Sequence, residues 1–187
     1  MKYNPKIHHR RSIRLKGYDY SKEGAYFITI CCQDRECRFG EIENEEMILN
    51  EYGRIAYDEW IKLSERFLNF ELDVFQIMPN HMHGIIVLNE HVTSAQNVLS
   101  DINDGTPVTN NRSRVNRDPT VGDIVGAYKS LVANDCLDIY KTKNEIMGKL
   151  WQRNYYEHII RDEKSYQAIS TYIINNPTKW SRDKFFI

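Results

Sequence analysis

The sequence predicts one α+β domain of the ferredoxin-like type, in which two helices pack on one face of an antiparallel sheet. Three observations support this prediction. The length of 187 residues suits a single domain. A hydrophobic share of 41% and an aromatic share of 12% are sufficient for a folded core. The predicted elements follow the order β-α-β-β-α-β, which is the order of that fold, and one more helix follows at the C-terminal end.

The first part of the chain contains a strand and a helix. The run YFITICC at 26–32 is unbroken and β-prone and follows Gly24, so it predicts a buried central strand. Residues 47–49 predict a short strand. Asn50 predicts the N-cap of a helix of about four turns, because apolar residues recur at helical spacing from there to Phe67.

Two β-rich segments follow at 71–78 and 81–88. The tight Pro79-Asn80 corner between them favours an antiparallel hairpin. From 92 to 119 the composition shifts to Ser, Thr, Asn and Asp, and the apolar periodicity disappears. We therefore expect an exposed, mobile insertion at 92–119.

The last part of the chain contains a helix, a strand and a second helix. Thr120 and Asp123 form a variant of the capping box, which predicts a helix that begins there. A strand is predicted at 150–160. The final helix is expected to begin near Asp162 and to end at Pro177, since proline cannot continue a helix.

The charge distribution indicates a segment that contacts nucleic acid. The net charge of −1 alone argues against a protein that coats nucleic acid without specificity. The first 22 residues are nevertheless basic and carry tyrosines, which suits contacts to phosphates and stacking on bases, although a solvated tail is the alternative. We divide the chain into a basic N-terminal arm at 1–22 and one domain at 23–187. The arm residues predicted to contact DNA are Arg10, Arg11, Arg14, Lys16 and Tyr20.

The cysteines and the apolar segments indicate the compartment. The four cysteines match neither a CxxC pair nor a zinc ribbon, and Cys31 and Cys32 are predicted to be buried apolar side chains. No apolar run approaches the length that spans a membrane, and the basic N-terminus has no apolar core of a secretory signal. We expect a cytoplasmic protein that does not contact a membrane.

The segment Pro79-Asn80-His81-Met82-His83 carries the clearest chemical signal. On a strand His81 and His83 point to the same side, while Met82 points into the core. Two imidazoles on one face can bind one divalent metal ion. An HxH sequence also arises by chance, and two histidines leave such an ion only half bound.

The final helix offers further groups for this site. Tyr172 and Asn176 are one turn apart and share a face of the predicted helix. A buried structural tyrosine and a helix-terminating asparagine are the alternatives. In the functional interpretation, Tyr172 is a nucleophile and the Asn176 amide oxygen is a third metal ligand. Because the pKa of tyrosine is about 10, attack on a phosphate requires a cation, and Mg²⁺ or Mn²⁺ suits this set of ligands.

Three motifs together resemble a known family. PNHMHGIIVL at 79–88, WQRNYYEHIIRDE at 151–163 and YIINNPTKW at 172–180 are similar to motifs of the REP-associated tyrosine transposases, a branch of the single-tyrosine HUH transposases of the insertion-sequence type. The opening RLKGYDYSKEGAYFITICC is also similar to the usual start of that family. The resemblance covers most of the chain except the insertion.

The resemblance implies an activity and a substrate. It implies a ferredoxin-like nuclease domain with His81 and His83 as metal ligands, Tyr172 as nucleophile and Asn176 at the place of the third ligand. Members of this family cleave single-stranded DNA beside short hairpins, form a 5′-phosphotyrosine and free a 3′-hydroxyl without ATP. The wider group has glutamine at the place of Asn176. Some relatives form dimers with composite sites and others act alone, so a monomer and a homodimer are both compatible with the sequence.

Three more residues are predicted to contact DNA, namely Lys129, Gln152 and His158. Structural hydrogen bonding is the alternative for His158. Two other functions compete with the transposase. One is an HUH replication initiator or relaxase, which is usually larger. The other is a non-catalytic ferredoxin-like nucleic-acid-binding protein, although no RNP-like aromatic pattern is visible. We expect a bacterial protein that associates with the nucleoid when it acts.

Overall fold

A computed structural model describes residues 19–20, 22–89 and 119–186. The main sheet contains β1 (Gly24–Cys31), β4 (Phe70–Met78), β5 (His81–Leu88) and β6 (Tyr156–Ile160), and β2 (Gly40–Glu43) and β3 (Glu46–Leu49) form a separate hairpin. The helices are α1 (Glu51–Ile61), α2 (Leu63–Arg66), α3 (Val121–Thr142) and α4 (Glu163–Ile174), with the 3-10 segments η1 (Gln33–Arg35) and η2 (Pro177–Arg182). Most of the arm predicted at 1–22 and of the insertion predicted at 92–119 lies outside the described residues, as do Arg10, Arg11, Arg14 and Lys16.

The ferredoxin-like fold predicted from the sequence is confirmed. The strand order in the main sheet is β4-β5-β1-β6, and all neighbouring strands are antiparallel. The expected hairpin at 71–88 is present as β4 and β5. In the register of the two central strands, Thr29 of β1 pairs with His83 of β5 and Cys31 pairs with His81. Both histidines therefore lie on an interior strand, where the backbone is fixed from both sides.

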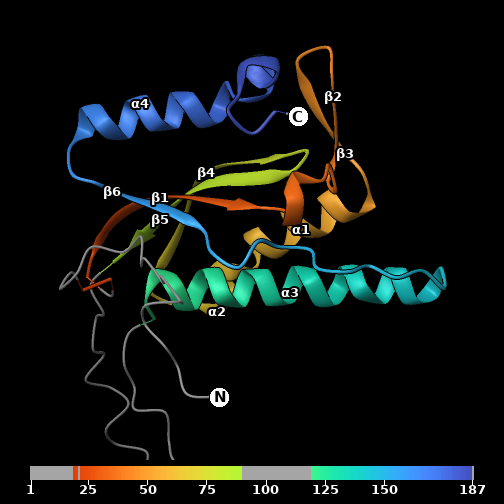
Figure 1. The fold of residues 1–187 in the computed structure, drawn as a ribbon. Helices are drawn as coiled ribbons and strands as arrows, with labels where there is room; N and C mark the ends of the chain where they lie inside the picture. The colour runs from red at the N-terminus through yellow and green to blue at the C-terminus, as the bar shows by residue number, and fades with distance from the viewer. Residues whose placement is uncertain (1–18, 21, 90–118, 187) are drawn as a thin grey trace, which may run out of the picture.

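The helices are distributed over the two faces of the sheet (Figure 1). α1, α2 and α3 cover one face, and the core between them and the sheet contains the buried side chains of Ile28, Trp60, Met82 and Tyr128. Gly84 permits the close approach of α1, since a Cβ atom there would lie 2.8 Å from the Trp60 ring. α4 and η2 lie over the opposite face. Side chains of β1 and β5 that point away from the core therefore point toward α4.

The predicted starts of the three long helices are confirmed by their caps. The Asn50 side chain accepts a hydrogen bond from the backbone of α1, Thr120 and Asp123 form a capping box on α3, and Asp162 caps α4. The cap at Asp162 starts α4 directly after β6, which places Tyr172 in the last turn of the helix. Among the residues that the structure describes, no helix has both the length and the apolar character needed to cross a membrane.

The strand predicted at 150–160 is wrong in its first half. β6 begins only at Tyr156, and residues before it make a single isolated bridge, between Trp151 and Cys32. The Lys129 ammonium group donates hydrogen bonds to the carbonyl oxygens of Gln152 and Arg153 at 2.7 and 3.1 Å. These carbonyls are satisfied by a helix side chain, so this stretch does not extend the sheet.

Two helix ends also differ from the prediction. The helix expected to continue to Phe67 divides at Lys62 into α1 and α2. The final helix ends at Ile174 rather than at Pro177, because Pro177 has no N–H group to donate to the Ile173 carbonyl. The chain continues as η2 with Pro177 at its start, which brings the residues after the helix back over the sheet.

Candidate active site

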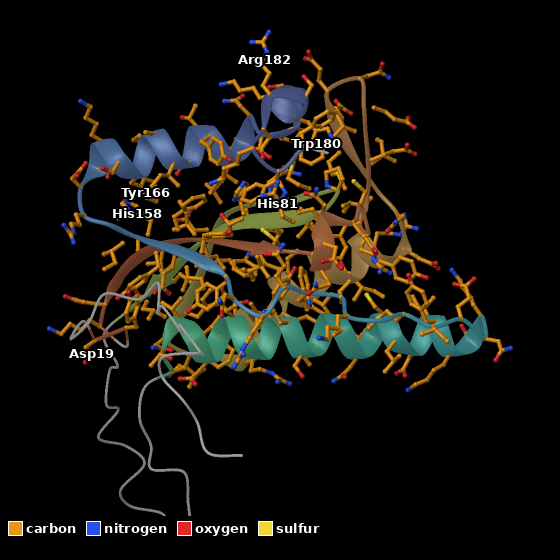
Figure 2. The ribbon with its side chains drawn as sticks, in the orientation of Figure 1. Asp19, His81, His158, Tyr166, Trp180 and Arg182 are labelled. Atoms are coloured by element: carbon orange, nitrogen blue, oxygen red, sulfur yellow. The ribbon has the colours of Figure 1, made fainter. Side chains whose placement is uncertain are left out.

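His81 and His83 lie beside each other on the face of β5 that points toward α4, and Figure 2 labels His81 there. Their Nε2 atoms are 3.0 Å apart, and both side chains are completely buried. Met82 belongs to the core on the opposite face. The prediction that the two imidazoles share one face while Met82 packs into the core is confirmed.

Each histidine is held through its Nδ1 atom. Nδ1 of His81 lies 2.8 Å from the Asn80 amide oxygen, and the Asn80 amide nitrogen donates to two backbone carbonyls. Because carbonyls only accept, the Asn80 oxygen must face His81, whose Nδ1 therefore donates. Nδ1 of His83 lies 2.8 Å from the Thr29 hydroxyl. With a proton on Nδ1, each Nε2 lone pair is directed to another partner, as in histidines that bind metal ions.

Tyr172 reaches this histidine pair from α4. Its hydroxyl lies 3.1 Å from Nε2 of His83 and donates to Oδ2 of Asp183 at 3.0 Å. The Asn176 amide nitrogen donates to the same oxygen of Asp183, also at 3.0 Å. The structure thus brings Tyr172, both histidines and Asn176 together within one chain. It adds Asp183, which follows η2 and which the sequence analysis did not identify.

A second contact fixes α4 on the sheet. The Tyr166 hydroxyl lies 2.9 and 2.8 Å from the two carboxylate oxygens of Asp73. Asp73 lies where the register of β4 shifts between Leu72 and Phe75. This irregularity directs an acidic side chain toward the helix. The contact anchors α4 upstream of Tyr172 and limits how far the helix can move from β5.

Aromatic rings enclose the histidines. The ring centre of Phe185 lies 4.5 Å from that of His81, and the Trp180 ring lies 5.9 Å from it, on the side of η2 (Figure 2). The Phe27 ring lies 5.3 Å from His83. Phe185 is itself 3% exposed. The Nε2 atoms are therefore shielded from solvent in this structure.

Burial sets the protonation states at the site. It lowers the pKa of His81 from 6.5 to about 3, with a smaller contribution from two nearby cations. The pKa of His83 is also lowered well below its usual value, first by burial and then by His81. Burial, followed by the charge of Asp183, raises the pKa of Tyr172. At neutral pH the site therefore holds two neutral imidazoles and a protonated phenol.

The two cations that lower the pKa of His81 are Lys184 and Arg35. The Arg35 guanidinium carbon lies 5.6 Å from the ring centre of Phe185, and the ammonium nitrogen of Lys184 lies 4.8 Å from it. Arg35 also donates a hydrogen bond to the Lys184 carbonyl at 3.2 Å. Positive charge from two distant parts of the sequence therefore flanks the histidines, in a position suited to phosphate groups.

The residues present fit a divalent cation. Two nitrogen ligands that each lie about 2.1 Å from one ion, at a right angle, are about 3.0 Å apart. The Nε2 atoms of His81 and His83 have this spacing. The amide oxygen of Asn176 is buried and has no hydrogen-bond partner. This buried oxygen is a candidate for a third protein ligand beside the two imidazoles.

Of the other predicted DNA contacts, the structure describes Tyr20, Lys129, Gln152 and His158. Tyr20 is 7% exposed, and its ring packs 6.1 Å from that of Tyr26. Lys129 supports the backbone at Gln152. His158 lies on the edge strand β6 and is exposed. Contact of these residues with DNA stays a prediction.

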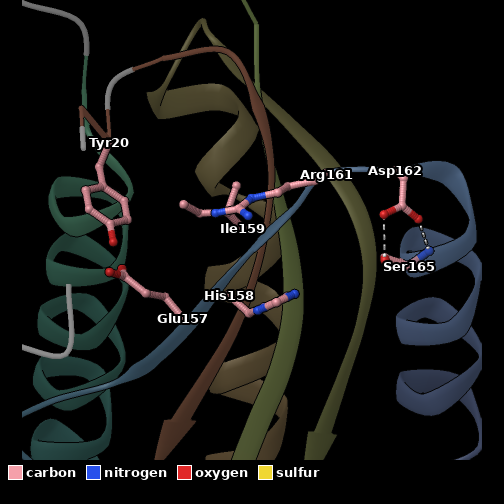
Figure 3. A pocket seen from close by; sticks show the side chains of 7 residues that line it. All are labelled: Tyr20, Glu157, His158, Ile159, Arg161, Asp162 and Ser165. Atoms are coloured by element: carbon pink, nitrogen blue, oxygen red, sulfur yellow. Dashed lines mark hydrogen bonds between the residues drawn. The ribbon is translucent and has the colours of Figure 1, made fainter. Parts of the chain in front are cut away.

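A pocket of about 380 Å³ lies between β6 and the start of α4. Figure 3 shows the side chains that line it, which come from the edge strand, from the first turn of α4 and from the segment before β1. Its lining includes Tyr20, His158 and Arg161. The pocket is separate from the histidine pair and contains two of the predicted DNA contacts.

Two groups at the site were missed for different reasons. Thr29 is the one polar residue in the run YFITICC, and alternation within a strand places it on the same face as Phe27. That signal was present in the sequence. Asp183 lies beyond Pro177 in a stretch without apolar periodicity, and only the three-dimensional path of η2 brings it to Tyr172.

Comparison with known proteins finds similar proteins and a solved structure of the same fold. An uncharacterized protein of Haemophilus influenzae is 45% identical over 186 residues, which is 100% of this chain and 98% of that protein. A second H. influenzae protein, whose name assigns it to the REP-associated tyrosine transposases, is 26% identical over 162 residues, 86% of this chain and 74% of that protein. The solved structure of a REP-associated tyrosine transposase bound to a REP hairpin matches with a TM-score of 0.58 and 21% identity over 91% of this chain and 76% of that one. No family model matches the chain.

Proposed function

We propose that the chain is a REP-associated tyrosine transposase, which nicks single-stranded DNA and transfers the cut strand with the help of a divalent metal ion. Tyr172 would be the nucleophile. His81, His83 and the amide oxygen of Asn176 would bind Mg²⁺ or Mn²⁺. The proposed substrate is single-stranded DNA that carries a hairpin.

One observation carries this proposal. The Tyr172 hydroxyl lies 3.1 Å from Nε2 of His83, whose other close neighbour is Nε2 of His81 at 3.0 Å. A tyrosine with only a structural role needs a hydrogen-bond partner, but it does not need two neutral imidazoles whose lone pairs converge. A nucleophile beside a metal-binding pair needs this arrangement.

When bound, the cation would withdraw charge from a phosphoryl oxygen and so assist attack on the phosphorus. In the proposed step the Tyr172 oxygen forms a bond to phosphorus, and the bond from phosphorus to the 3′ oxygen breaks. The tyrosine loses one proton and the leaving 3′ oxygen gains one, so the step is balanced. Oδ2 of Asp183, which already accepts the hydrogen bond of Tyr172, lies where that proton departs.

The products explain how a strand could be transferred without ATP. The DNA would be left with a 5′-phosphotyrosine and a free 3′-hydroxyl. The phosphotyrosine keeps the energy of the broken phosphodiester. Attack by a second 3′-hydroxyl would release Tyr172 and join the two strands.

The proposed substrate rests on a relative and on the charge near the site. A REP-associated tyrosine transposase of the same fold has been solved with a REP hairpin. In this chain Arg35 and Lys184 offer positive charge close to the histidines. Unpaired DNA can align one phosphate with Tyr172, whereas continuous duplex holds each phosphate in a fixed path. We therefore expect duplex of the same sequence to be inert.

The direct test is the formation of a covalent adduct. The protein is incubated with Mn²⁺ and hairpin-bearing single-stranded DNA, unstructured single-stranded DNA or perfect duplex, and the mass of the protein is measured. We expect an adduct on Tyr172 with the hairpin substrate and none with the duplex. Tyr172→Phe should abolish the adduct, and so should the double change His81→Ala and His83→Ala.

A matched control is Tyr57→Phe, which makes the same change at a tyrosine that is 42% exposed on α1. This variant should form the adduct as the unchanged protein does. An adduct that persists in Tyr172→Phe would place the nucleophile elsewhere. Equal cutting of duplex and hairpin would contradict the proposal that the substrate is single-stranded DNA with a hairpin.

A further inference from the structure

We propose that Asp183 is a positioning residue, which turns the Asn176 amide so that its oxygen is presented to the metal ion and holds the Tyr172 hydroxyl beside it. This inference rests on the proposed function. It assigns a role to a residue that lies beyond α4 and outside the motifs at 79–88, 151–163 and 172–180.

The hydrogen bonds of Asp183 define the orientation of its neighbours. Oδ2 accepts one bond from the Asn176 amide nitrogen and one from the Tyr172 hydroxyl, each at 3.0 Å. An ionised carboxylate has no proton to donate, so both neighbours must direct their donors toward it. A rotation of the Asn176 amide by half a turn would bring its oxygen against the carboxylate, which is unfavourable.

This orientation leaves the Asn176 oxygen as an available ligand. Asn176 is 1% exposed, and its amide oxygen is buried without a hydrogen-bond partner. Its backbone is already used at the junction of α4 and η2, where its N–H donates to Ile173 and its carbonyl accepts from Lys179. A buried amide oxygen without a partner carries a desolvation cost of about 1–3 kcal/mol, which binding of a cation would remove.

Asp183 is itself held in place. Its backbone N–H donates to the Trp180 carbonyl at 3.0 Å, and its Oδ1 accepts from the backbone N–H of Phe185 at 2.7 Å. Both carboxylate oxygens are therefore occupied by donors of the chain. Asp183 is not among the ligands we assign, because its two oxygens already accept hydrogen bonds from Tyr172, Asn176 and Phe185. Its effect on a bound metal ion would act through Asn176.

The experiment measures Mn²⁺ binding to the full chain without DNA, from the electron paramagnetic resonance signal of free Mn²⁺. Asp183→Leu keeps a similar size and removes the acceptor. We expect it to weaken Mn²⁺ binding by roughly 10- to 100-fold, the usual effect of losing a residue that orients a metal ligand. Asp183→Asn can still accept one hydrogen bond but no longer dictates the amide orientation. Its loss of Mn²⁺ affinity should therefore be smaller than that of Asp183→Leu. Circular dichroism checks that each variant is folded.

A double-mutant cycle separates positioning from other roles. In an Asn176→Ala background there is no amide to orient, so Asp183→Leu should change the Mn²⁺ affinity by less than about 2-fold. An equal loss in both backgrounds would overturn the inference, since Asp183 would then act independently of Asn176. Mn²⁺ affinity unchanged in Asp183→Leu would also overturn it.

Two further variants distinguish failure of this inference from failure of the proposed function. Phe186→Ala removes an exposed side chain from the segment that follows Asp183 but keeps the carboxylate and the Phe185 ring, and it should retain Mn²⁺ binding close to that of the unchanged protein. If Phe186→Ala weakened binding as much as Asp183→Leu, the packing of the segment would explain the loss and Asp183 would not be a positioning residue. The double change His81→Ala and His83→Ala should abolish binding. If that variant bound Mn²⁺ normally, the proposed metal site itself would be wrong.

Discussion

The Thr29 hydroxyl lies 2.8 Å from Nδ1 of His83, its cross-strand partner on β5. Thr29 is 2% exposed, so water does not compete for this contact. When Nδ1 of His83 carries the proton, the hydroxyl accepts it and the Nε2 lone pair is left for a metal ion. The pairing of β1 with β5 thus places this hydroxyl beside a residue proposed to bind metal.

Replacing Thr29 with valine should therefore impair the site more than the fold. Thr29→Val keeps the shape of the side chain but removes the hydroxyl that contacts Nδ1 of His83. We expect the free energy of unfolding to fall by about 1–3 kcal/mol and Mn²⁺ affinity to fall by about 10-fold or more. Urea denaturation and Mn²⁺ titration measure the two effects. Thr171→Val on the exposed side of α4 is the control, and equal Mn²⁺ affinity in the two variants would contradict the role of Thr29.

The anchor between Tyr166 and Asp73 should hold the nucleophile in register with the histidines. Tyr166→Phe removes a hydrogen bond to a charged group, so we expect the free energy of unfolding to fall by about 1.5–3 kcal/mol. Adduct formation should also slow, because α4 carries Tyr172. Hydrogen exchange of the α4 amides measures the loosening. Tyr57→Phe should change neither the free energy of unfolding nor the rate of adduct formation. If the α4 amides of Tyr166→Phe exchanged as slowly as those of the unchanged protein, the anchor would not be needed.

The stability of the metal-free protein should depend on pH through the buried histidines. The folded protein holds His81 with a pKa of about 3, whereas the unfolded chain binds the proton near pH 6.5. The pKa of His83 is lowered in the same direction. Below the unfolded pKa the unfolded state binds more protons, so stability is complete above about pH 6.5 and is lost as the pH falls toward the folded pKa.

Urea denaturation in the presence of a chelator, at about pH 6.5 and about pH 5, measures this loss. Each histidine should contribute at most about 1.4 kcal/mol per pH unit. The double change His81→Asn and His83→Asn should remove most of the slope in this range, where few carboxylates titrate. An unchanged slope in that variant would assign the pH dependence to other groups.

The cations beside the site should contribute to DNA affinity without sequence preference. Arg35→Ala and Lys184→Ala should each weaken binding of single-stranded DNA and reduce the slope of log affinity against log salt by about 0.7 if the residue contacts one phosphate. Fluorescence anisotropy at several salt concentrations gives both numbers. Lys141→Ala, at the far end of α3, is the control for loss of one positive charge. A salt slope equal to that of the control would exclude contact with phosphate.

The sequence was sufficient to predict those features of the structure that depend on neighbouring residues. The caps at Asn50, Thr120 and Asp162 each depend on a few neighbouring residues, and all three predicted helix starts are correct. Alternation along β5 likewise determined which side of the strand His81 and His83 occupy.

Other features depend on contacts between distant residues and could not be predicted in this way. The strand β2 was missed because its turn uses Asn44 and Glu45 at positive φ, 49° and 67°, without a glycine to indicate it. The strand predicted from residue 150 fails because Lys129 on α3 satisfies the carbonyls of the segment. The contact of Asp183 with Tyr172 depends on the path of the chain after Pro177, and no local sequence pattern indicates that path.

Within the described residues, the Tyr172 hydroxyl and Nε2 of His83 meet in the same chain, 3.1 Å apart. This arrangement has a genetic consequence. If the chemistry is completed within one polypeptide, two inactive variants cannot repair each other. A mixture of Tyr172→Phe chains and chains with His81→Ala and His83→Ala should therefore show no activity. A cell that carries both variant genes should likewise lack the activity, and only an intact copy of the gene should restore it.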